Sequence, residues 1–157
     1  MRKRIVEPPR SSNPAPEGEW LALDHLARVE LSSEDPAHPI EGALSPERDG
    51  GWRAGHPGEQ LVRVVFDEPQ PLRRIWLRFV EPSAERTQEF TLRWRSAEAS
   101  GTREIVRQQW TFAPGGAMSE TEDYRVELPA VAVLELVIRP DVGGGDARAS
   151  LDALRLA

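Results

Sequence analysis

Residues 60–95 read QLVRVVFDEPQPLRRIWLRFVEPSAERTQEFTLRWR and carry the clearest periodic pattern in the chain. Apolar side chains alternate with charged or polar ones in three runs, at residues 60–66, 74–80 and 89–95. A repeat of two residues places the apolar side chains on one face of a β-strand and the arginines on the other. The turn-forming segment DEPQP at residues 67–71 separates the first two runs, so we expect three strands joined by turns.

The same alternation continues through the rest of the chain, and no segment keeps the period of about 3.6 that marks an amphipathic helix. Further strands are expected at residues 27–32, 103–110, 124–128, 133–139 and 154–156. About eight short strands are typical of an antiparallel β-sandwich or jelly roll, so the predicted fold class is all-β, with under about a fifth of the chain helical. The residues expected in its core are Phe66, Leu77, Phe79, Phe90, Leu92, Leu136 and Ile138.

The composition fits one globular domain. The chain has 157 residues, 39% of them hydrophobic, with a net charge of −6. This predicts a single sandwich domain at residues 20–157 after a proline-rich, flexible N-terminal tail at residues 1–19. The absence of cysteine and of an apolar signal segment suits a cytoplasmic protein. The negative charge argues against nucleic-acid binding, no apolar run approaches the roughly 18 residues of a membrane span, and the oligomeric state stays open.

The order of the expected pieces is informative. A strand at residues 28–33 leads into a long irregular loop that contains Asp49-Gly-Gly-Trp52. A valine-rich strand, a Glu68-Pro69 turn, a strand pair, an apolar strand at residues 134–139 and a short terminal segment with Asp152 follow. This order resembles the discoidin (coagulation-factor C-type, galactose-binding-like) family over residues 27–157. The resemblance implies an antiparallel sandwich that binds a ligand.

The resemblance also implies where a metal ion would lie. Many discoidin-like domains hold calcium near these positions with carboxylates and loop carbonyl oxygens, which are the ligands that calcium prefers. The matching carboxylates are Asp49 and Asp152, so a structural calcium ion is expected there if the protein holds one. No other cofactor is predicted.

The loop at residues 51–56 reads Gly-Trp-Arg-Ala-Gly-His and combines an aromatic ring, a guanidinium group and an imidazole. Sugars stack their C–H faces on aromatic rings, and their hydroxyls need paired donors and acceptors. We therefore predict Trp52, Arg53 and His56 as ligand-binding residues. The alternative is that Trp52 plugs the end of the core while the other two are solvated. Trp110 is a further candidate for ligand binding, and its alternative is also a place in the core.

Several arginines share the outward face of the predicted strands. They are Arg63, Arg74, Arg78, Arg93, Arg95 and Arg107. Such a face suits an acidic partner, but glutamates such as Glu89, Glu104 and Glu127 alternate along the same strands and can pair with it across the sheet. The paired arrangement is the ordinary one.

No catalytic pattern stands out. The three histidines lack metal-ligand spacing, and Asp24-His25 with a serine such as Ser32 lacks the strand–turn–helix context of a nucleophile. We therefore expect no catalytic residues and no enzyme. The prediction is a non-catalytic module that binds carbohydrate through loops at one end of the sandwich, and the alternative is an intracellular protein–protein interaction module. Both functions occur on this fold, so the fold does not choose between them.

Overall fold

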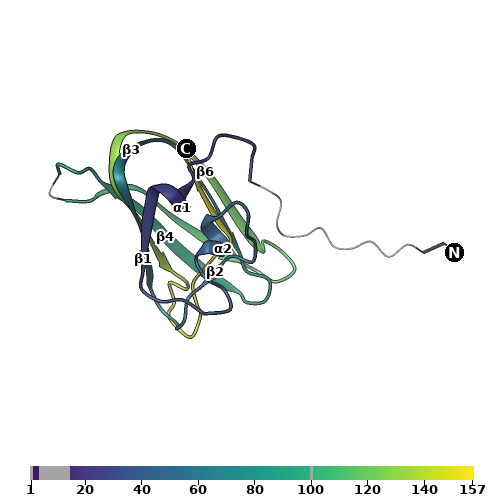
Figure 1. Ribbon diagram of the computed structural model, residues 1–157. Coiled ribbons are helices and arrows are strands. Elements are labelled where there is room, and N and C mark those ends of the chain that lie inside the picture. Colours follow the sequence, from purple (N-terminus) through teal and green to yellow (C-terminus); the bar gives the residue numbers. More distant parts are fainter. Residues whose placement is uncertain (1, 4–14, 100) are drawn as a thin grey trace.

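The computed structural model describes residues 2–3, 15–99 and 101–157, and antiparallel strands dominate it (Figure 1). The elements are α1 Leu23–Leu26, β1 Ala27–Leu31, α2 Glu41–Leu44, β2 Trp52–Arg53, β3 Gln60–Val80, β4 Arg86–Arg95, β5 Arg103–Phe112, β6 Ser119–Arg139, β7 Ser150–Leu151 and β8 Ala153–Leu156. Each helix has only four residues. The predicted all-β fold class is confirmed.

Two strands of 21 residues each, β3 and β6, run through both layers of the sandwich. The first half of β3 lies between β1 and the second half of β6. That half of β6 also pairs with β4, and β4 pairs with β5 at the edge. These five strands form one layer. The second half of β3 pairs with the first half of β6 and with β8, and these three form the other layer. The short strands β2 and β7 pair with each other separately.

The strand pattern differs from the prediction where β3 and β6 cross between the layers. The segment DEPQP, expected as a turn, lies inside β3, and the strands expected at residues 124–128 and 133–139 are parts of β6. The register between β3 and β6 shifts between Val65 and Gln70. Proline removes a backbone donor but is tolerated at such irregularities, so the prolines of this segment lie within a continuous strand instead of ending it.

The inward faces of the two layers enclose one apolar core. All seven residues predicted for it are at most 5% exposed: Phe66, Leu77, Phe79, Phe90, Leu92, Leu136 and Ile138. The rings of Phe79 and Phe90, one from each layer, have centroids 5.1 Å apart. The predicted core is therefore confirmed.

The outward arginines pair with carboxylates, mostly on neighbouring strands. Arg63 binds Glu30 and Glu135 at N–O distances of 3.1 and 3.0 Å, and Arg93 binds the second oxygen of Glu135 at 2.7 Å. Four further pairs are Arg74 with Asp123, Arg78 with Asp152, and Arg107 with Glu104 and Glu89. The predicted pairing is confirmed for these arginines, but Arg78, which was predicted to face outward, is buried at 8% exposure.

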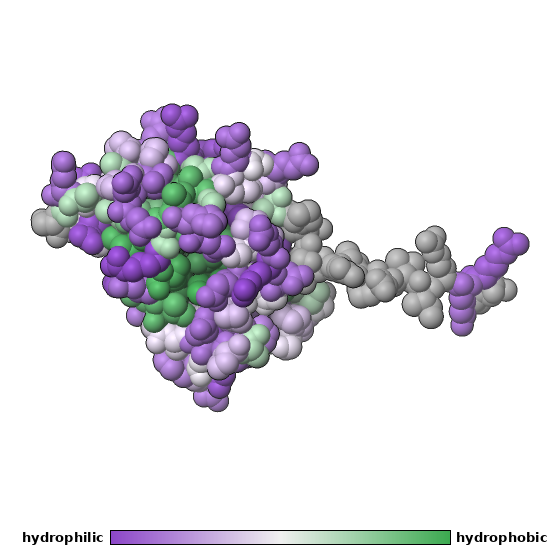
Figure 2. Space-filling model, viewed as in Figure 1, coloured by the Kyte–Doolittle hydropathy of each residue, from purple (hydrophilic) through white to green (hydrophobic). Residues whose placement is uncertain are grey.

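Figure 2 shows one side of the molecule, with hydrophilic side chains around most of its outline and an apolar area in the middle. Neither short helix in the described part of the chain is long and apolar enough to cross a membrane. Of the predicted tail, residues 15–19 are described and lead directly to Trp20. Residues 1 and 4–14 lie outside the described residues, so the boundary between tail and domain stays a prediction.

Candidate functional site

At one end of the sandwich, the long loop between β1 and β3 meets the end of the loop between β6 and β7. Trp52 of β2 pairs with Leu151 of β7, and the preceding Gly50 and Gly51 have φ angles of +92° and +67°, where glycine is favoured. A Cβ on Gly51 would lie 2.8 Å from the carbonyl oxygen of Leu151. The two backbones are thus in direct contact. We call residues 49–52 the ridge.

The side chain of Trp52 anchors the ridge in the apolar core. Its side chain is 1% exposed, belongs to the apolar core cluster, and donates a hydrogen bond from Nε1 to the carbonyl oxygen of Ser33 at 3.2 Å. The ring therefore has no free face for a sugar, and the predicted stacking role of Trp52 is not supported. The pairing of β2 with β7 directs this side chain into the sandwich, so Trp52 is the plug of the alternative interpretation.

The other three predicted ligand-binding residues do not line one common cleft. Arg53, next to Trp52, is exposed and lines a cleft beside the ridge. His56 is exposed, its Nδ1 lies 3.0 Å from the carbonyl oxygen of Pro57, and it does not line that cleft. Trp110 lies on β5 opposite Gln88 and packs against the core, also away from the cleft. Of the predicted set, Trp52 and Arg53 line this cleft, and of these two only Arg53 is exposed.

This cleft, which we call cleft A, has a volume of about 640 Å³. The ridge and Arg53 form one side, the loop between β3 and β4 forms another, and residues 141 and 146–148 of the loop after β6 also line it. The volume lies within the range of about 300–1,000 Å³ that is usual for small-molecule sites. Five carboxylates and three guanidinium groups line cleft A, so it offers both acceptors and donors.

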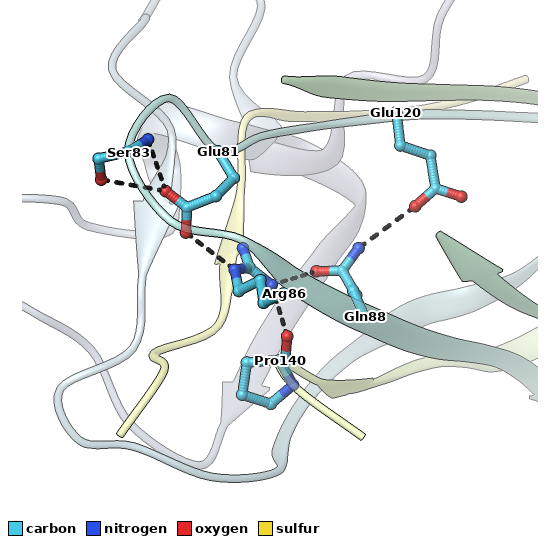
Figure 3. Close-up of polar contacts among 6 residues, drawn as sticks. All are labelled: Glu81, Ser83, Arg86, Gln88, Glu120 and Pro140. Atoms are coloured by element: carbon cyan, nitrogen blue, oxygen red, sulfur yellow. Dashed lines mark hydrogen bonds and ion pairs between the residues drawn. The ribbon is translucent and has the colours of Figure 1, made fainter. Parts of the chain in front are cut away.

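Arg86 of β4 anchors the loop between β3 and β4 (Figure 3). Its side chain is 1% exposed and donates from Nε to Glu81 at 2.8 Å and from Nη1 to the carbonyl oxygen of Pro140 at 2.7 Å. The guanidinium carbon lies 4.8 Å from the ring centroid of Phe112. Burial raises the pKa of Glu81, but the hydrogen bond and charge of Arg86, together with hydrogen bonds from Ser83, lower it overall. This wall of cleft A is therefore held in place from inside the fold.

A series of side-chain hydrogen bonds leads from Arg86 into the sandwich. Arg86 Nη1 donates to Gln88 Oε1 at 3.3 Å, and Gln88 Nε2 donates to Glu120 Oε1 at 3.4 Å (Figure 3). Glu120 is 1% exposed, and burial together with the nearby Glu122 raises its pKa to about 8. Its carboxyl group does not line cleft A. A proton held there bears on the stability of the fold more than on a ligand in the cleft.

The two carboxylates predicted for calcium both line a second cleft of about 540 Å³ that we call cleft B, and Asp152 lines cleft A as well. Asp152 Oδ2 accepts a hydrogen bond from Arg78 Nε at 2.7 Å, so a guanidinium group already neutralises it. Calcium takes six to eight oxygen ligands. In residues 2–3, 15–99 and 101–157, no group of three or more His, Asp or Glu side chains is placed to hold a metal ion. The calcium site stays a prediction from the resemblance.

The charged residues that line cleft A were not predicted from the sequence. Glu81, Glu85, Asp146 and Arg148 lie in turns far apart in the chain, and acidic residues in turns are ordinary local chemistry. The one signal was the polar composition of these loops, two of which are also rich in glycine. Their convergence depends on the topology of the sandwich, which local sequence does not show.

The fold is shared with solved structures, although no protein-family model and no curated protein matches the sequence. A family 32 carbohydrate-binding module of Clostridium perfringens NanJ, in complex with galactose, has a TM-score of 0.62 and 12% identity, with 83% of this chain and 92% of that chain covered. A second module from C. perfringens, CpGH89CBM32-5 in complex with GalNAc-β-1,3-galactose, has a TM-score of 0.63 and 14% identity, over 87% and 98% of the two chains.

A third similar structure is reduced XRCC1 bound to the DNA polymerase β catalytic domain. It has a TM-score of 0.61 and 16% identity, over 84% of this chain and 96% of that chain. At such identities the likeness establishes the fold alone. The chain therefore has the discoidin-like, galactose-binding-like β-sandwich fold that the resemblance implied.

Proposed function

We propose that this chain is a non-catalytic carbohydrate-binding module and that cleft A holds the sugar. The observation that carries the proposal is a cleft of about 640 Å³, lined by both donors and acceptors, at the loop end of a fold shared with several carbohydrate-binding modules. Binding residues are usually carried on loops that a rigid scaffold positions. The Arg86 contacts and the ridge supply that rigidity here.

The chemistry of cleft A favours a neutral sugar. A hydroxyl group donates one hydrogen bond and accepts others, so it pairs equally well with a guanidinium group and with a carboxylate. Arg53 and Arg148 provide exposed donors, and Glu85 and Asp146 provide exposed acceptors. Because carboxylates outnumber guanidinium groups in the lining, an anionic sugar meets repulsion that a neutral one avoids.

The affinity of cleft A for a single sugar is expected to be weak. The tryptophan that lines it, Trp52, is buried, so cleft A lacks the indole face on which a sugar ring can stack. Hydrogen bonds to sugars replace bonds to water and give a small net gain. We expect a dissociation constant in the millimolar range, equivalent to about −4 kcal/mol.

The test is an NMR titration of the labelled protein with galactose, N-acetylgalactosamine, glucose, mannose and galacturonic acid. We expect at least one neutral sugar to shift the amide signals of the ridge and of residues 81–86, and galacturonic acid to bind more weakly. Arg53→Ala should weaken binding about fivefold, equivalent to roughly 1 kcal/mol. His56→Ala removes an exposed side chain of the same loop outside cleft A, and should not change the affinity.

The proposal is wrong if none of these neutral sugars shifts any amide signal at concentrations well above millimolar. It is also wrong if sugars bind but the shifts map away from cleft A. Equal losses from Arg53→Ala and His56→Ala would place the contact elsewhere on the loop.

A second candidate function is protein binding, which one observation favours. The outer face of the five-stranded layer carries a groove of about 560 Å³ lined by Leu61, Val137 and charged side chains that include Glu89 and Arg139. XRCC1, which has a similar fold, is bound to a polymerase domain in its structure. For a partner in this groove, Arg139→Glu should abolish binding, and Arg53→Ala should leave it unchanged. The cytoplasmic location predicted from the sequence favours this candidate over carbohydrate binding.

A further inference from the structure

Clefts A and B share part of their lining. Gly50 and Asp152 line both of them, so the two clefts adjoin at the ridge. Gly50 carries no side chain, and a Cβ built there would meet nothing within 4 Å. The ridge is therefore open to solvent at Gly50. A chain-like ligand held in cleft A has a direct route into cleft B across this glycine.

We propose that cleft B is a second saccharide subsite, so that the ligand is an oligosaccharide that crosses the ridge and places a sugar ring against Trp20. The inference rests on the proposed function, because it assumes that cleft A holds the first sugar. It adds a contact that cleft A lacks, namely an indole ring that is only partly buried and lines the cleft. Stacking on that ring would turn a weak single-sugar contact into a stronger oligosaccharide contact.

Trp20 is held in one orientation before any ligand arrives. Its Nε1 donates to the carbonyl oxygen of Pro16 at 2.9 Å, and the amide of Leu21 donates to the carbonyl oxygen of Leu156 on β8 at 2.7 Å. The guanidinium carbon of Arg74 lies 4.9 Å from the centroid of the indole ring. Arg74 is itself fixed by two hydrogen bonds to Asp123, of 2.8 and 2.6 Å. A ring that is already ordered loses little conformational entropy on binding.

The polar lining of cleft B also suits a neutral sugar. Three cations and three anions line it: Arg48, Arg78, Arg155, Glu17, Asp49 and Asp152. Arg155 is 9% exposed and donates from Nη1 to the carbonyl oxygens of Ala43 and Leu154, at 2.8 and 2.9 Å. Burial and the neighbouring charge of Arg78 lower the pKa of Arg155. The charges of cleft B balance, whereas carboxylates are in excess in cleft A, and an uncharged ligand avoids repulsion in both clefts.

The ridge between the clefts is rigid, which fixes the distance that the ligand must span. A Cβ on Gly42 of α2 would lie 2.7 Å from the carbonyl oxygen of Gly51, and a Cβ on Gly51 would lie 2.8 Å from that of Leu151. The ridge backbone is thus clamped between α2 and β7. Two subsites at a fixed separation raise the affinity of a ligand that is long enough to fill both, and leave the affinity of a shorter ligand unchanged.

The experiment is calorimetric titration with galactose, galactobiose and galactotetraose, and with glucose, cellobiose and cellotetraose. We expect the affinity to rise about tenfold or more from monosaccharide to tetrasaccharide in one series. Trp20→Ala should remove about tenfold of the tetrasaccharide affinity and leave the monosaccharide affinity unchanged. Trp20→Phe keeps an aromatic face and should retain most of the affinity. Thermal melts of both variants check that the fold is intact.

The outcomes separate this inference from the proposed function. If monosaccharides bind in cleft A but affinity does not rise with length, the subsite in cleft B is wrong and the proposed function stands. The same holds if Trp20→Ala leaves tetrasaccharide affinity unchanged. If Trp20→Ala and Trp20→Phe lose equal affinity, the ring does not act by stacking and the inference is overturned. If no sugar in either series binds, the subsite in cleft B is overturned, and the proposed function fails with it only if N-acetylgalactosamine and mannose also leave the amide signals unshifted.

Discussion

Neighbouring side chains in residues 50–54 face opposite environments. Trp52 and Ala54 are 1% and 0% exposed, whereas Arg53 between them is exposed and lines cleft A. The two glycines differ in the same way, because a Cβ on Gly51 would meet the backbone of Leu151 and one on Gly50 would meet nothing. A single loop thus contributes to the core with one side and lines the open cleft A with the other. The residue types alone did not show which side was which.

The largest effect is expected from the inward side chain. Trp52→Ala should lower the free energy of unfolding by about 3–5 kcal/mol, because the variant loses apolar burial and leaves a cavity under the ridge. Urea unfolding of the variant and of Trp20→Ala measures this, and Trp20→Ala should cost far less since its ring is only partly buried. Equal losses in the two variants would contradict the division between the two sides.

The two ridge glycines give a smaller and better matched comparison. Gly50→Ala places a side chain in the left-handed region and should cost about 1–2 kcal/mol of unfolding free energy. Gly51→Ala adds a contact with the carbonyl oxygen of Leu151 and should cost about 2–4 kcal/mol. Thermal unfolding of the pair tests whether the ridge is clamped against β7. A smaller loss for Gly51→Ala than for Gly50→Ala would show that the ridge can shift.

Sequence alone predicted the sandwich well, because a strand repeats its pattern every two residues. That period assigned Phe79, Phe90 and Leu92 to the core, and all three are buried. The same reasoning failed at Trp52, since residues 51–56 have no period and glycine makes the direction of the next side chain unpredictable. It also failed at cleft A. The walls of that cleft come from three loops that are separated in the sequence, and their convergence depends on the topology of the whole sandwich.

Strand β6 also has side chains that point into the core and side chains that point to solvent, and this difference makes the stability of the fold depend on pH. Glu120 faces the interior and its pKa rises to about 8 from an ordinary 4.5, because burial and Glu122 disfavour the charged form. Below about pH 4.5, both the folded and the unfolded chain hold the proton, and Glu120 adds no pH dependence. Between pH 4.5 and about 8 the folded chain keeps the proton and the unfolded chain releases it, so stability falls as pH rises.

The slope from this one proton is at most about 1.4 kcal/mol per pH unit. Glu120→Gln keeps a group that can pair with Gln88 but cannot ionise, so the fall in unfolding free energy across this range should flatten. Glu127→Gln changes an exposed glutamate of the same strand and should leave the slope as it is. Urea unfolding at several pH values between 5 and 8 measures all three proteins. Identical slopes for the parent chain and Glu120→Gln would mean that the buried carboxyl is already ionised at neutral pH, with water or a cation compensating the charge inside the sandwich.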